Sequence, residues 1–102
     1  MLGEKNLERC GQVDRRLSVL KEQIQPLSMA ANRQSRYQDE SPTTHSNILR
    51  RLIDALSINT FFLSDNYQDG AEFDSIMTTV ETTLSAVEAR IAELCKAWGV
   101  EL

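Results

Sequence analysis

The chain has 102 residues, of which 41% are apolar and 25% charged, and this is the size and composition of one soluble globular domain. Its four glycines and two prolines are too few for a fold rich in strands and turns. The net charge of −4 and the pI near 4.9 argue against nucleic acid as the partner, because nucleic-acid binding rewards clustered Lys and Arg.

The N-terminal sequence carries charged residues from Glu4 onward and has no apolar stretch, so we expect no secretory signal. No segment approaches the roughly 20 apolar residues that a transmembrane helix needs. We therefore expect a cytoplasmic protein that does not engage a membrane.

We predict a first helix over residues 4–36, because its apolar residues recur at alternating spacings of three and four. Pro26 lies inside this pattern and lacks the N–H of a continuous helix, so we expect a kink there or a break into two shorter helices. The polar run 32–40 has no periodicity, and we expect the helix to fray through it. The apolar seam consists of Cys10, Val13, Leu17, Leu20, Ile24, Leu27 and Ala31.

We predict a second helix over residues 42–63, with Ser41 as its N-cap and Pro42 in its first position. The turn formers in 64–70 close it. Wound at 100° per residue, its apolar residues spread over about 180°. A helix this widely apolar must contact more than one neighbour. The residues of this arc are Ile48, Leu49, Leu52, Ile53, Ala55, Leu56, Phe62 and Leu63.

We predict a third helix over residues 70–98, ended by Gly99 in the left-handed conformation. Its seam is narrow, like that of a coiled coil, and runs through Phe73, Met77, Val80, Leu84, Val87, Ile91, Leu94 and Trp98. Three helices with short links favour a single all-α domain over residues 1–102, folded as a small three-helix up-down-up bundle with coiled-coil-like heptad packing.

The charges indicate how the first and third helices pair. Residues 1–37 carry a net charge of +3, and residues 69–102 carry −5. In an up-down-up bundle these helices are parallel, and the heptad register then places Arg9 and Arg16 opposite the flanking acids of the third helix. Those acids are Asp74, Glu81 and Glu88. We therefore expect the chain to close its own seam, with a homodimer that exchanges helices as the alternative.

The residue types that usually carry chemistry are sparse. The single histidine, His45, falls at a helix start with no partner indicated, and Cys10 and Cys95 lie on apolar seams, where free thiols behave as core residues. The turn around Asp65 and Asp69 lacks the oxygen ligands that a calcium loop needs at its third and twelfth positions. We predict no catalytic, metal or cofactor site, and no enzyme activity.

One part of the predicted second helix carries apolar residues that the core does not need. Ile58 and Phe61 fall outside the apolar arc, on the side that holds Arg50, Arg51 and Asp54. An aromatic or aliphatic anchor beside arginine is common in protein-binding hot spots. We predict that these five residues, the outer patch, bind a partner. In the alternative, the helix ends near Asn59 and Phe61 folds inward.

These observations predict a small non-catalytic helical protein that acts by binding another protein, as an inhibitor, adaptor or assembly factor. A nucleic-acid-associated regulator is an alternative, and it would use Arg33, Arg36, Arg50 and Arg51. A structural subunit of a larger helical assembly is another. No cofactor is expected.

Overall fold

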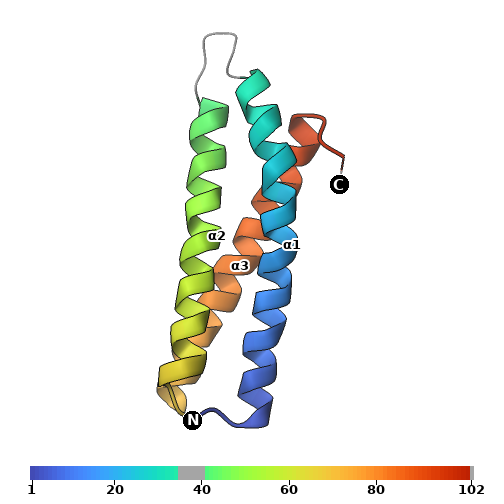
Figure 1. Ribbon diagram of the computed structural model, residues 1–102. Coiled ribbons are helices and arrows are strands. Elements are labelled where there is room, and N and C mark those ends of the chain that lie inside the picture. The colour runs from blue at the N-terminus through green and yellow to red at the C-terminus, as the bar shows by residue number, and fades with distance from the viewer. Residues whose placement is uncertain (35–40, 102) are drawn as a thin grey trace.

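A computed structural model describes residues 1–34 and 41–101. It contains three helices, α1 (Glu4–Gln34), α2 (Ser41–Asn66) and α3 (Ala71–Ala97). They form an up-down-up bundle in which α1 and α3 run in the same direction and α2 runs against both (Figure 1). The prediction of a small all-α bundle is confirmed.

Helix α1 includes Pro26 and continues on both sides of it, so the chain does not form two separate helices there. Pro26 lacks the N–H that the carbonyl of Glu22 would accept from, and the predicted kink stays a prediction. The predicted end of this helix at residue 36, and most of the expected fraying, fall on residues 35–40 and lie outside the described residues.

Helix α2 is longer than predicted, because residues read as turn formers complete its last turn. The side chains of Ser64 and Asn66 donate hydrogen bonds to the carbonyl oxygens of Phe61 and Phe62, at 2.9 and 3.1 Å. Short polar side chains at a helix end can satisfy carbonyls in the turn before them. The predicted end at residue 63 is therefore three residues too early.

Helix α3 ends as its sequence predicts. Gly99 has a φ of 69°, in the left-handed region, and the backbone N–H of Val100 donates to the carbonyl oxygen of Cys95 at 2.8 Å. This is the bond of a Schellman motif, in which the chain turns back over the last helical turn. Val100 packs against the core as a result.

The core lies along the predicted seams. All seven seam residues of α1 are buried, and so are the first seven of the eight on α3, while Trp98 is half-buried against the same cluster. The seam of α3 is thus covered by helices of its own chain.

The predicted charge pairs between α1 and α3 are present. Arg9 forms ion pairs with Glu81 at 2.6 Å and with Asp74 at 3.1 Å, and Arg16 pairs with Glu88. Hydrogen bonding to these carboxylates raises the pKa of both guanidinium groups. These three ion pairs join residues that are 65 to 72 positions apart in the sequence. Together they fix the register of the parallel helices α1 and α3.

The start of α1 is held by the turn between α2 and α3. The backbone N–H of Gly3 donates to both oxygens of the Asp69 carboxylate, at 2.9 and 3.1 Å, and the Asn6 side chain donates to it at 2.9 Å. A side chain 66 positions along the sequence therefore supplies an acceptor for a backbone donor at the helix start. A Cβ on Gly3 would lie 2.6 Å from the Asp69 carboxylate, so any other residue there would require that carboxylate to shift.

We expect Asp69→Ala to lower the melting temperature at neutral pH, because α1 loses this acceptor. The hydrogen bond from Gly3, and to a lesser extent that from Asn6, lowers the pKa of the Asp69 carboxyl below its ordinary value. The stabilisation is therefore complete above the unfolded-state pKa and disappears as the pH falls through the lower, folded-state pKa.

The measurement is the difference in melting temperature between the wild type and Asp69→Ala, followed downward from pH 7. The control is Asp65→Ala, which removes an exposed carboxylate from the last turn of α2. A difference for Asp69→Ala that stays constant down to the lowest pH at which both proteins fold would contradict the assignment.

Candidate functional site

Helix α2 buries a narrower stripe than its apolar arc predicts. The buried positions are Ser46, Leu49, Ile53, Leu56, Thr60 and Leu63. Two of them are polar, and both are satisfied: the Thr60 hydroxyl donates to the Leu56 carbonyl oxygen at 2.7 Å, and the hydroxyls of Ser46 and Ser28 lie 2.7 Å apart. Hydrogen-bonded hydroxyls can occupy core positions at little cost. The way the helices pack, and not side-chain hydrophobicity alone, therefore decides which residues of α2 are buried.

The consequence is that α2 leaves large apolar side chains in solvent. Four residues of the predicted arc, including Ala55, are exposed, which corrects the expectation that the whole arc packs against neighbours. Over the described residues α3 exposes no large apolar side chain, whereas α2 exposes five. These are Ile48 at 51%, Leu52 at 38%, Ile58 at 56%, Phe61 at 64% and Phe62 at 54%.

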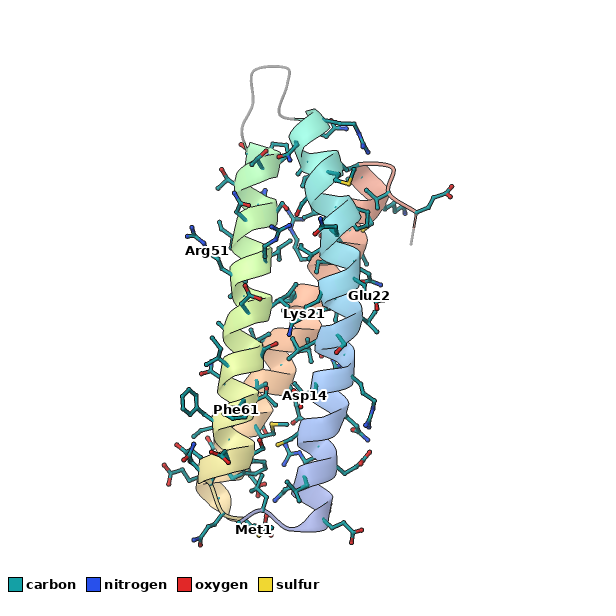
Figure 2. The ribbon with its side chains drawn as sticks, viewed as in Figure 1. Met1, Asp14, Lys21, Glu22, Arg51 and Phe61 are labelled. Carbon is teal, nitrogen blue, oxygen red and sulfur yellow. The ribbon has the colours of Figure 1, made fainter. Side chains whose placement is uncertain are left out.

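The outer patch is exposed in full. Arg50, Arg51, Asp54, Ile58 and Phe61 are all exposed, and Arg51 and Phe61 point away from α1 (Figure 2). The alternative in which Phe61 folds inward is wrong, because α2 continues past Asn59 and carries Phe61 around on its outer side.

The arginines are arranged less closely around Phe61 than the sequence suggested. The Arg50 guanidinium donates to the Ser28 hydroxyl at 2.8 Å and so reaches toward α1. Arg51 is ten residues before Phe61, which is about 15 Å along a helix. Ile58 is the patch residue on the turn next to Phe61, so the apolar pair forms one end of the patch and the charged residues the other.

A groove between α2 and α3 was not foreseen from the sequence. Its volume is about 430 Å³, and none of the described residues that line it is charged. Leu56, Leu63 and Val80 are buried beneath it, and its walls include Leu52 and Phe62 of α2 and Ile76, Thr79 and Thr83 of α3. We call this feature the α2–α3 groove.

A sequence signal for the groove exists. Ile48, Leu52, Ala55, Asn59 and Phe62 recur at spacings of four and three, which is a second stripe beside the buried one. The buried stripe and this second stripe together form the single apolar arc predicted for α2. Because the whole arc was expected to pack against other helices, no groove was predicted.

The two phenylalanines connect the groove with the outer patch. The rings of Phe61 and Phe62 meet edge to face, with centroids 6.2 Å apart. Phe62 lines the groove and Phe61 does not. The patch and the groove are therefore neighbouring surfaces on one helix, and each has residues that the other lacks.

The cysteines and the histidine differ in their surroundings. Cys10 and Cys95 are free and buried, and burial raises the pKa of both thiols, which disfavours the thiolate. His45 is exposed in the first turns of α2. Among residues 1–34 and 41–101, no three His, Cys, Asp or Glu side chains are grouped so as to hold a metal ion.

The arginines of the nucleic-acid alternative are divided between helices. Arg33 is exposed in the last turn of α1, Arg50 and Arg51 lie in the first half of α2, and Arg36 lies outside the described residues.

None of the helices, over the part of the chain that is described, has an apolar stretch long enough to cross a membrane.

Comparison with known proteins gives no relative from which a function could be transferred. No protein-family model, no curated protein and no solved structure matches the chain.

Proposed function

We propose that this protein is a small non-catalytic helical protein that acts by binding another protein, as an inhibitor, adaptor or assembly factor. The observation that supports this is the concentration of exposed apolar side chains on α2, given above. Scattered single apolar residues are normal on a protein surface, but a group on one helix is typical of an interaction site.

Within this surface, the outer patch is the proposed contact for the partner. Ile58 and Phe61 supply the apolar anchor, and Asp54 and Arg51 supply exposed charges about one and two turns before Ile58. A large aromatic residue with charged residues at its margin is the usual composition of a binding hot spot. Because Phe61 is mostly in solvent, its loss should affect binding far more than folding.

The test is the variant Phe61→Asp. We expect its free energy of unfolding to remain within about 0.5 kcal/mol of the wild type, as for other surface substitutions. We also expect that the immobilised variant no longer retains the protein that the wild type captures from a lysate of the source cell. Binding energy concentrates in a few such anchors, so the loss should be at least tenfold in affinity, or roughly 1.4 kcal/mol.

The matched control is Val19→Asp, which places the same charge at an exposed apolar position of α1, at a site 51% exposed. This variant should keep the partner. If Phe61→Asp retains the captured protein as well as Val19→Asp does, the outer patch is not the contact surface.

A further inference from the structure

Over the described residues, the contact of α2 with α3 lacks the ion pairs found between α1 and α3. Ion pairs line the contact of α1 with α3, and hydrogen bonds from Arg50 and between Ser28 and Ser46 join α1 to α2. Across the α2–α3 groove, no ion pair between described residues joins the two helices. The groove instead presents apolar and neutral side chains to solvent.

The charges around this face are distributed toward opposite ends. No Lys or Arg occurs between Arg51 and Arg90, so the half of the α2–α3 hairpin near its turn carries acids alone. Asp65 and Glu72 are exposed there. At the other end Arg51, Arg90 and Lys96 are exposed, and so is Glu93, which pairs with Arg90 at 3.0 Å. Viewed along the groove, the face is acidic at the turn, and basic side chains outnumber acidic ones at the opposite end.

Glu72 and Arg90 occupy equivalent positions on α3. They are separated by 18 residues, which is five full helical turns, so they share one flank of the helix. The same winding places Ile76 and Thr83 on this flank, and both line the groove. An acid and a base therefore stand at the two ends of the groove wall that α3 provides.

We propose that the α2–α3 groove is closed by a second copy of the chain, in an antiparallel two-fold dimer. A two-fold axis perpendicular to the helices brings the acidic end of one copy to the basic end of the other, twice. A parallel arrangement would instead place like charges together. The charges therefore favour a second copy of the chain as the molecule that covers the groove, because a two-fold rotation places the acidic end of one face against the basic end of the other.

The residue pairs across this dimer follow from helix geometry. Since α2 and α3 are antiparallel with a short turn between them, Ser57 and Glu81 lie at about the same height. An axis at that height sets Leu52 of one copy against Phe62 of the other, because each is five residues from Ser57. It also sets Glu72 against Arg90, because each is nine residues from Glu81. Opposite charges at both ends then flank an apolar centre.

The proposal does not rest on the apolar anchor of the proposed function, because Ile58 and Phe61 do not line the groove; Arg51 is the residue that the outer patch shares with the basic end of this face. A dimer closed in this way presents two outer patches. Failure to dimerise would leave the partner test with Phe61→Asp intact, and failure of that test would leave the dimer intact.

The experiment is sedimentation of the purified full chain from micromolar to millimolar concentration. We expect a reversible dimer for the wild type. Leu52→Glu places a charge in the groove at a position 38% exposed, and should give a monomer with an unchanged helical circular dichroism spectrum. Val19→Glu, on α1, is the control and should remain dimeric. A wild type that stays monomeric at millimolar concentration, or a Leu52→Glu variant that dimerises as well as the wild type, would overturn the proposal.

A charge exchange tests the antiparallel arrangement. Glu72→Arg places arginine against Arg90 at both ends, and we expect the dimer dissociation constant to rise by roughly tenfold or more. Adding Arg90→Glu to it should restore an affinity near that of the wild type. If the double variant is as weak as the single one, Glu72 and Arg90 do not face each other and the proposed dimer is wrong.

Discussion

Phe73→Ala should destabilise the protein by about 3–5 kcal/mol, the cost of removing a fully buried aromatic ring. Phe73 is fully buried at the start of α3, in the same cluster as Met77. The Arg9 guanidinium also lies over its ring, 5.8 Å from the centroid. Since a domain of this size has roughly 5–15 kcal/mol of stability in all, this single change should remove a large part of it.

The measurement is denaturant unfolding of Phe73→Ala beside Phe61→Ala. The two variants lose the same side chain on neighbouring helices, but Phe61 is mostly in solvent. We expect Phe61→Ala to change the free energy of unfolding by less than about 0.5 kcal/mol. Equal losses for the two variants would show that the described packing of α2 and α3 is incorrect.

Arg16→Glu should destabilise the bundle by about 2 kcal/mol, because it removes the ion pair with Glu88 and sets two half-buried carboxylates against each other. Arg16 also donates to the Ser85 hydroxyl at 3.1 Å, and that bond is lost as well. Exchanging the charges in Arg16→Glu/Glu88→Arg should recover most of the stability. A double variant no more stable than Arg16→Glu would contradict the parallel register of α1 and α3.

The neighbouring arginine provides the control for this prediction. Arg15 pairs with Glu8 on its own helix, at 3.0 Å, and both side chains are more than half exposed. Arg15→Glu makes the same change in net charge at the next position, yet should cost only a few tenths of a kcal/mol. Salt should reduce the difference between the two variants, because it screens the repulsion in Arg16→Glu.

Much of the fold follows from the sequence because its strongest signals are periodic or local. The seams of α1 and α3 repeat over many turns, and a repeat of that length specifies which face is buried whatever the neighbour is. The charge register of Arg9 and Arg16 follows from the same repeat once the helices are parallel. The end of α3 is equally local, because Gly99 can adopt the left-handed conformation without steric cost.

The limits of α2 were harder to predict because they depend on short polar side chains. Asn66 and Ser64 are turn formers by composition, but in this chain their side chains reach back to carbonyls of their own helix. The capping of α1 by Asp69 is similar, since it joins residues 66 positions apart. The Asp69 contact leaves no pattern in the sequence, because it depends on where the ends of the bundle meet.

The sequence by itself determined that this protein is a helical bundle and which faces of α1 and α3 are buried, but it left open whether Phe61 lies in the core. The tertiary structure alone decided how α2 is oriented. Its apolar arc is wider than two helical neighbours can cover, and hydrogen bonds allowed Ser46 and Thr60 to be buried in place of Leu52 and Phe62. The helix therefore turned an apolar flank outward, and the groove beside α3 is the result.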